Sequence, residues 1–244
     1  MTAKELKASI LDLSVRGKLV PQDPNDEPAS VLLEKIRAEK RKLVKAGKIK
    51  KEKNPSEIYI AADGKPYEKF ANGSETCIED EIPFELPKGW AWARLGGIAL
   101  SITDGDHQPP PQTTTGIPFL VISNVSSGEA SFERLRYVTP EYFASLSEDR
   151  KPAVGDLLFT VTGSYGIPIR IETNRDFCFQ RHIALLKFPD LDTNFLKNVL
   201  ESPFVKKQCD DIATGTAQKT IPLTGLRNRS EEHTSELQSP VPIS

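Results

Sequence analysis

Three polar segments combine glycine with side chains suited to hydrogen bonding. They run over residues 103–111 (TDGDHQPPP), 160–166 (TVTGSYG) and 214–220 (TGTAQKT). Glycine lets a backbone approach another molecule closely, and hydroxyl and backbone N–H groups bond phosphate oxygens. Gln and His side chains bond the edges of bases. These residue types therefore indicate contact with a nucleic acid.

The candidate DNA-binding residues come from these segments and from a polar stretch on a predicted strand. Within the third segment, the Lys219 ammonium suits phosphates and the Gln218 amide suits base edges. The full set is Asp104, His107, Gln108, Thr162, Ser164, Tyr165, Gln180, Arg181, His182, Thr214, Thr216, Gln218 and Lys219.

The sequence contains none of three common catalytic motifs. It lacks a G-x-x-x-x-G-K-[ST] phosphate loop, a G-x-G-x-x-G fingerprint and a G-x-S-x-G nucleophile turn. Cys178 and His182 are typical of core residues rather than of zinc ligands. Two alternatives stay open. One is a metal-dependent DNA nuclease that uses Asp104, Asp106 and Asp156, and the other is a protein–protein interaction module without DNA binding.

Composition narrows the class of protein. The 244 residues include 38% hydrophobic residues, too many for a disordered chain, and no apolar run of the ~18 residues that span a membrane. The N-terminus lacks the apolar region of a signal peptide, and the three cysteines have no metal-type spacing. We therefore expect a cytoplasmic protein without disulfides.

The net charge of −2 conceals a marked segregation. Residues 35–53 carry ten basic and two acidic side chains, whereas residues 54–86 carry eight acidic and two basic ones. The basic segment is either a solvated helix face or a surface near nucleic acid.

Two amphipathic helices are predicted to precede the polar segments. Leu6, Ile10 and Leu13 recur at helical spacing before Gly17, and a second helix runs from about residue 27 to residue 47. Residues 48–85 are predicted to be a charged linker. Further helices are expected at 140–146, 193–202 and 203–212. Short apolar runs predict strands at 98–102, 117–123, 156–162, 167–172 and 178–188.

These elements predict an α+β fold, with a mixed twisted sheet preceded by a pair of amphipathic helices. The expected domains are a helical dimerisation region (1–47), the linker (48–85), a recognition domain (86–228) and a tail (229–244). Written as codons, residues 229–239 resemble a common adapter of short-read DNA sequencing translated in frame. We therefore expect the tail to be artefactual and exclude it from fold reasoning.

Four motifs, taken in order, resemble the target recognition domain of type I restriction-modification DNA specificity subunits. An N-terminal block from Leu6 to Val20 also resembles the conserved helical regions of that family. The four motifs are Leu86-Pro87-x-Gly89-Trp90-x-Trp92-x-x-Leu95-Gly96, Asp104-Gly105-x-His107-x-x-Pro110, Pro152-x-x-Gly155-Asp156-Leu157-Leu158 and Gly215-Thr216-Ala217-Gln218-x-x-Ile221.

The resemblance implies a non-catalytic subunit that reads one half of a split site in double-stranded DNA. Its partners would be methyltransferase subunits, which bring S-adenosylmethionine, and restriction/translocase subunits, which use ATP and Mg. The chain itself would bind no cofactor or metal. It departs from the family in having one recognition domain and no spacer helix after Leu226, so we expect a truncated subunit. Phosphate neutralisation shared with partners makes near-neutral charge compatible with DNA binding.

Overall fold

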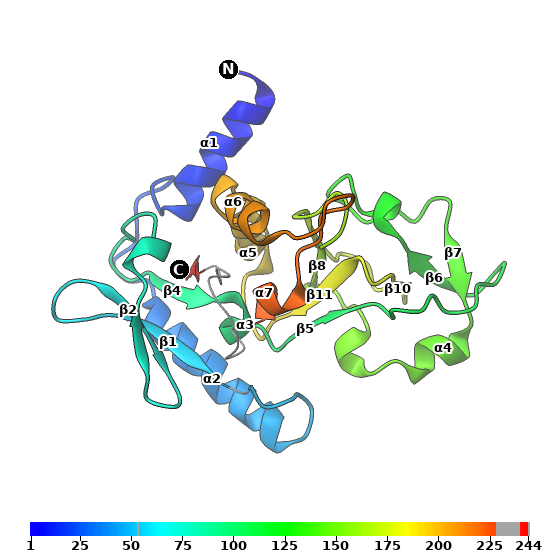
Figure 1. Ribbon diagram of the computed structural model, residues 1–244, viewed down its shortest axis with the longest axis horizontal. Coiled ribbons are helices and arrows are strands. Elements are labelled where there is room, and N and C mark those ends of the chain that lie inside the picture. The colour runs from blue at the N-terminus through cyan, green and yellow to red at the C-terminus, as the bar shows by residue number, and fades with distance from the viewer. Residues whose placement is uncertain (53, 228–239, 244) are drawn as a thin grey trace.

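The computed structural model describes residues 1–52, 54–227 and the backbone of 240–243. Its helices and mostly antiparallel sheets confirm the predicted α+β class. In Figure 1, α1 extends away from the rest of the molecule, while the sheets lie side by side along the long axis. Among the residues described, no helix has the length and apolarity needed to cross a bilayer.

Both predicted N-terminal helices are present as α1 (Ala3–Val15) and α2 (Ala29–Lys45). The Thr2 hydroxyl accepts a hydrogen bond from the Glu5 backbone N–H at 3.2 Å, which caps the start of α1. After each helix, a glycine with positive φ reverses the chain, Gly17 at 62° and Gly47 at 68°. Of the predicted apolar face of α1, Leu6 remains 49% exposed and Ile10 43% exposed.

Residues 48–85, predicted as a linker, contain an antiparallel sheet. Its strands are β1 (Ser56–Ile60), β2 (Pro66–Phe70) and β3 (Glu75–Cys77), followed by the 3₁₀ helix η1 (Glu79–Glu81). The strands were missed because they are short and rich in charge, so they lack a clear apolar alternation. Whether this segment is a separate domain stays a prediction.

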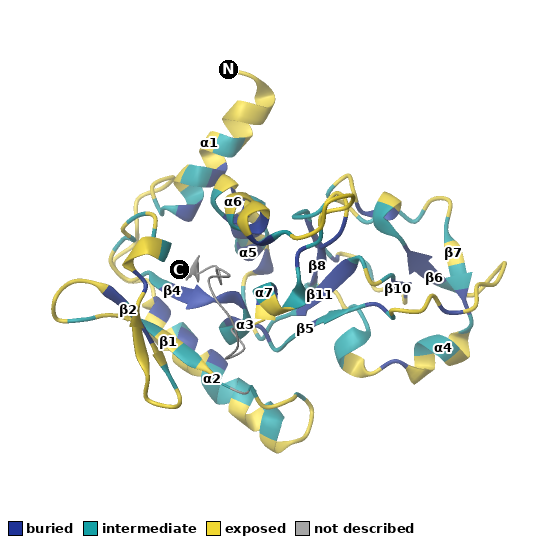
Figure 2. Ribbon diagram, viewed as in Figure 1, coloured by how far each residue is buried: buried dark blue, intermediate teal, exposed yellow. Residues whose placement is uncertain are grey.

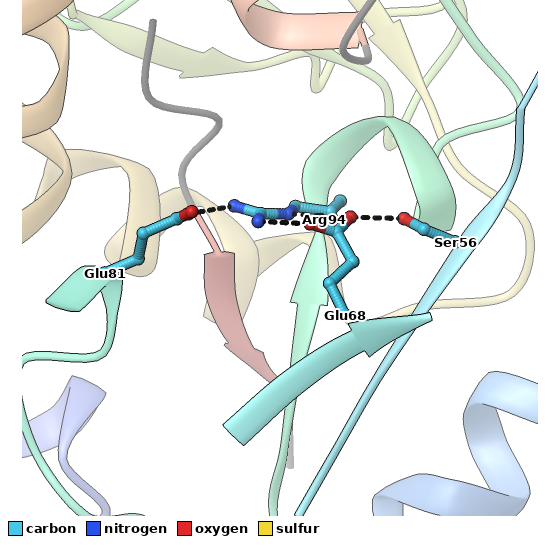
Figure 3. Close-up of polar contacts among 4 residues, drawn as sticks. All are labelled: Ser56, Glu68, Glu81 and Arg94. Carbon is cyan, nitrogen blue, oxygen red and sulfur yellow. Dashed lines mark hydrogen bonds and ion pairs between the residues drawn. The ribbon is translucent and has the colours of Figure 1, made fainter. Parts of the chain in front are cut away.

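A buried group of charges, the Arg94 cluster, joins this sheet to β4 (Ala91–Arg94). The Arg94 guanidinium donates to Glu68 at 2.5 Å and to Glu81 at 2.7 Å. Ser56 donates a hydroxyl hydrogen bond to the other oxygen of Glu68 (Figure 3). Arg94 is 5% exposed and Glu68 is fully buried, so these charges depend on one another rather than on water.

The centre of the fold is a four-stranded antiparallel sheet in the order β5-β11-β8-β9. Successive residues of its middle strands enter different cores. Phe159 and Ala184 pack towards the helices α5 (Thr193–Glu201) and α6 (Pro203–Ile212), whereas Leu158 and Leu185 pack towards Leu120 on the other side. Figure 2 accordingly shows β8 and β11 as buried. The strands are β5 (Ser101–Asp104), β8 (Leu157–Thr160), β9 (Pro168–Arg170) and β11 (Ile183–Lys187).

A smaller mixed sheet has the order β10-β6-β7, with β10 parallel to β6. The segment 178–188, expected as one strand, is divided into β10 and β11 by a turn at residues 180–182. The helices expected near 140, 193 and 203 are confirmed. The elements not yet given bounds are α3 (Leu95–Ile98), β6 (Ile117–Leu120), η2 (Ile122–Asn124), β7 (Arg136–Val138), α4 (Pro140–Ser145), η3 (Glu148–Arg150), β10 (Cys178–Phe179), α7 (Leu223–Arg227) and β12 (Pro240–Ile243).

The segment predicted to be an artefactual tail lies mostly outside the described residues. Of it, the structure describes only the backbone of β12, which pairs antiparallel with β4.

Candidate nucleic-acid interface

An open cleft of about 510 Å³ brings together parts of all three polar segments. Six predicted DNA-binding residues line this polar cleft, namely Asp104, His107, Thr162, Arg181, His182 and Gln218. The remaining lining residues are Val161, Thr220, Ile221, Pro222, Leu223 and Arg227. Residues up to 123 positions apart in sequence, Asp104 and Arg227, therefore line one surface.

Gly105 holds the first segment against the turn between β10 and β11. A Cβ atom at this buried position would lie 2.2 Å from the Phe179 carbonyl oxygen and 2.7 Å from the Arg181 backbone nitrogen. Only glycine fits so close to another backbone. The approach brings Asp104 and His107 to the same cleft as Arg181 and His182.

The second and third segments are joined by backbone pairing. Thr162 forms an antiparallel bridge with Thr220, and the Gly163 N–H donates to the Lys219 carbonyl at 3.1 Å. A Cβ at Gly163 would lie 3.0 Å from Nε2 of Gln218, so the Gln218 amide rests against this glycine. Figure 1 shows the chain between α6 and α7 passing over the end of β8.

Arg181 and His182 contribute hydrogen-bonding groups in the middle of the cleft. Nε of Arg181 donates to Nε2 of His182 at 3.3 Å. Burial and the neighbouring charge of Arg181 lower the pKa of the His182 imidazole below its usual value of 6.5. His182 is therefore mostly neutral at pH 7, and because its Nε2 accepts from Arg181, its Nδ1 carries the proton and is a donor.

Arg227 is a cleft residue that the sequence analysis missed. It lies in the last turn of α7, where its Nε donates to the Ile102 carbonyl at 2.5 Å. The available signal was a cation six residues after Ile221, which ends the fourth motif, but the position of Arg227 depends on how α7 folds back onto β5.

Two of the three acidic residues of the nuclease alternative, Asp106 and Asp156, are held in separate ion pairs. Asp106 accepts from Arg150 at 2.6 Å and from the Tyr142 hydroxyl at 2.5 Å, and Asp156 accepts from Lys187 at 2.5 Å. Burial opposes ionisation of Asp106, but the hydrogen bonds from Tyr142 and Arg150 lower its pKa overall. In the described part of the chain, no group of three His, Cys, Asp or Glu residues is placed to hold a metal ion. The structure does not favour this alternative.

The other predicted residues lie beside the cleft rather than in its lining. The Tyr165 hydroxyl donates to Asp210 at 2.7 Å, and Thr214 forms a backbone bridge with Thr220. The Gln180 backbone bonds to Leu120 and Ile183, which shapes the turn after β10. Four residues are exposed on the same segments: Gln108, Ser164, Thr216 and Lys219. Their contact with DNA stays a prediction.

Comparison with known proteins identifies sequence relatives. Over 130 residues the chain is 46% identical to the EcoAI type I restriction enzyme specificity subunit of Escherichia coli, covering 53% of this chain and 19% of that protein. Over 110 residues it is 48% identical to the EcoEI specificity subunit of Escherichia coli, covering 43% and 15%. The matched part thus spans less than a fifth of these relatives. No protein-family model matches the sequence.

Solved structures give weaker similarities. The HsdS subunit of Thermoanaerobacter tengcongensis aligns with a TM-score of 0.42 at 19% identity, covering 67% of this chain and 36% of that chain. A chain from a structure of type I R-M system assembly and conformational transition aligns with a TM-score of 0.47 at 18% identity, covering 100% and 48%. The sequence relatives confirm the similarity to type I restriction enzyme specificity subunits that the four motifs indicated.

Proposed function

We propose that this chain recognises one half of a split DNA sequence as part of a type I restriction-modification specificity subunit. The observation that carries the proposal is the polar cleft, where six residues predicted from the sequence to bind DNA lie together. The similarity to two proteins named as specificity subunits supports the same function.

The proposed division of labour follows from side-chain chemistry. The Gln218 amide is exposed and suits a bidentate contact with adenine, while Arg181 suits guanine. Neutral His182, whose Nε2 accepts from Arg181, can donate its Nδ1–H to a base edge. Lys219 and Arg227 are exposed cations suited to phosphates, which fix position rather than sequence.

We further propose that the chain itself is non-catalytic and acts in the cytoplasm with methyltransferase and restriction/translocase subunits. S-adenosylmethionine, ATP and Mg would be bound by those partners. The exposed Leu6 and Ile10 of α1 fit this arrangement, because an open apolar helix face is suited to packing on a partner helix.

The test is selection of a preferred sequence from randomised duplex DNA by the chain co-expressed with a type I methyltransferase subunit. We expect enrichment of a short half-site. Gln218→Ala should relax preference at one or two positions, costing about 1–3 kcal/mol of discrimination, whereas Lys219→Ala should weaken binding equally on all sequences.

Two exposed residues outside the cleft lining supply matched controls for this selection, Asn174→Ala for the amide and Lys88→Ala for the cation. Both controls should leave the selected sequence and the affinity unchanged. The absence of any enriched sequence would contradict the proposed function.

A further inference from the structure

A second cluster of charges, the Asp210 cluster, consists of Tyr165, Lys206, Asp210 and Lys219. A single oxygen of Asp210, Oδ1, accepts from the Tyr165 hydroxyl at 2.7 Å and from the Lys206 ammonium at 2.8 Å. The same ammonium lies 3.9 Å from the centre of the Tyr165 ring. A hydroxyl donor and a cation thus bond one negatively charged oxygen, and the cation also packs on an aromatic face.

The Asp210 cluster lies at the rim of the polar cleft. A Cβ at Gly166 would lie 3.5 Å from Cδ of Lys206, so the lysine side chain extends along the turn that follows Thr162. Lys219 directly follows the cleft residue Gln218. Hydrogen bonds from Lys206 and Tyr165 lower the pKa of Asp210, and the positive charge of Lys219 lowers it further.

These donors match what a phosphate oxygen requires. Hydroxyl and ammonium groups are the usual partners of DNA phosphates, and bonds to charged oxygens are among the stronger hydrogen bonds. The side chains of Lys206 and Asp210 are 46% and 47% exposed, so water screens their attraction and replacing the carboxylate costs little. Another anion can therefore replace the Asp210 carboxylate as the partner of Lys206 and Tyr165.

We propose that Asp210 occupies, in the DNA-free protein, a position that a phosphate of duplex DNA takes over when DNA enters the cleft. Tyr165, Lys206 and Lys219 then hold that phosphate, and Asp210 opposes binding by competing for the donors and repelling the backbone. A phosphate is the same at every base pair, so the competition by Asp210 weakens binding to all DNA sequences equally. Discrimination between DNA sequences then depends on the contacts to base edges. The inference rests on the proposed function.

The experiment compares Asp210→Asn with Asp211→Asn in the full chain. Asp211 is the next residue on α6, is exposed and forms no ion pair within the described residues, so both variants remove one negative charge. Binding to a labelled mixed-sequence duplex of about 30 base pairs is measured by fluorescence anisotropy between about 50 and 200 mM salt.

We expect Asp210→Asn to tighten binding about 3-fold to 10-fold and to steepen the slope of log affinity against log salt concentration by roughly one. Asp211→Asn should change the affinity less than about 2-fold. Equal effects of the two variants, or weaker binding by Asp210→Asn, would overturn the inference alone. Failure of the unmodified chain to bind duplex DNA at any salt concentration would instead overturn the proposed function on which it rests.

A double-mutant cycle with Lys206→Gln tests the competition directly. If the carboxylate and the phosphate compete for this ammonium, the gain from Asp210→Asn should fall to less than about half in the Lys206→Gln background. A gain of the same size in both backgrounds would contradict the shared site.

Discussion

The Arg94 cluster and the Asp210 cluster use the same chemistry in opposite surroundings. Each places a cation and a hydroxyl against a carboxylate. Arg94 is 5% exposed, whereas the Lys206 side chain is 46% exposed. A charge removed from water must keep its partner, while a charge that water still reaches can exchange its partner for another. Burial therefore separates the ion pairs that hold this fold from those available for binding.

The largest expected effect is a loss of stability when the buried Arg94 cluster is broken. Arg94→Met should lower the free energy of unfolding by about 3–5 kcal/mol, because it leaves the carboxylate of Glu68 buried without its main counter-charge. Lys206→Met, the exposed counterpart, should cost under about 1 kcal/mol. Urea unfolding followed by circular dichroism measures both, and losses of similar size would refute the distinction.

The second-largest expected effect concerns the close contact between Gly105 and the backbone of the turn after β10. Gly105→Ala should lower stability by about 1–3 kcal/mol and weaken DNA binding more than ten-fold, because its Cβ would collide with the carbonyl of Phe179 and separate the two sides of the cleft. Gly97→Ala is the control, since the nearest atom would be 3.9 Å away. Thermal melting and fluorescence anisotropy give the two readouts. Unchanged binding by Gly105→Ala would show that the cleft does not depend on this close approach.

The smallest expected effect concerns pH. Because the folded-state pKa of His182 lies below its unfolded value of 6.5, the unfolded chain takes up a proton first as the pH falls. The stability contribution of His182 is therefore complete above pH 6.5 and is lost as the pH falls through the lower folded-state pKa. His182→Gln should flatten the decline in melting temperature between pH 7.5 and about 5.5. An equally steep decline in the variant would assign that pH dependence to other groups.

The sequence predicted the elements whose apolar spacing is regular. Leu6, Ile10 and Leu13 marked α1, and the apolar run after Asp156 marked β8. The sheet formed by β1–β3 was missed because its short strands lack a regular apolar alternation. Glu68 of β2 is fully buried, yet a glutamate is expected to be exposed until its partner Arg94 is known.

The cleft was predictable in its residue types and not in its assembly. His107, Thr162 and Gln218 were selected because they lie in polar segments that combine glycine with hydrogen-bonding side chains, and the structure places them together. Asp210 was not selected, since an acidic residue on a helix is ordinarily a solvated surface charge. Its partner Tyr165 lies 45 residues away in the sequence, and only folding places the two side chains in contact.

The division of β11 between two cores has a consequence for how such a molecule can diversify. Residues Ile183–Leu186 are fully buried, yet the turn that presents Arg181 and His182 ends immediately before them. Substitutions in that turn alter the surface offered to a ligand without changing the volume of either core. Substitutions at residues 180–182 can therefore change the binding preference of the protein while its fold stays the same. Substitutions from Ile183 onward would instead disturb the packing of a buried strand.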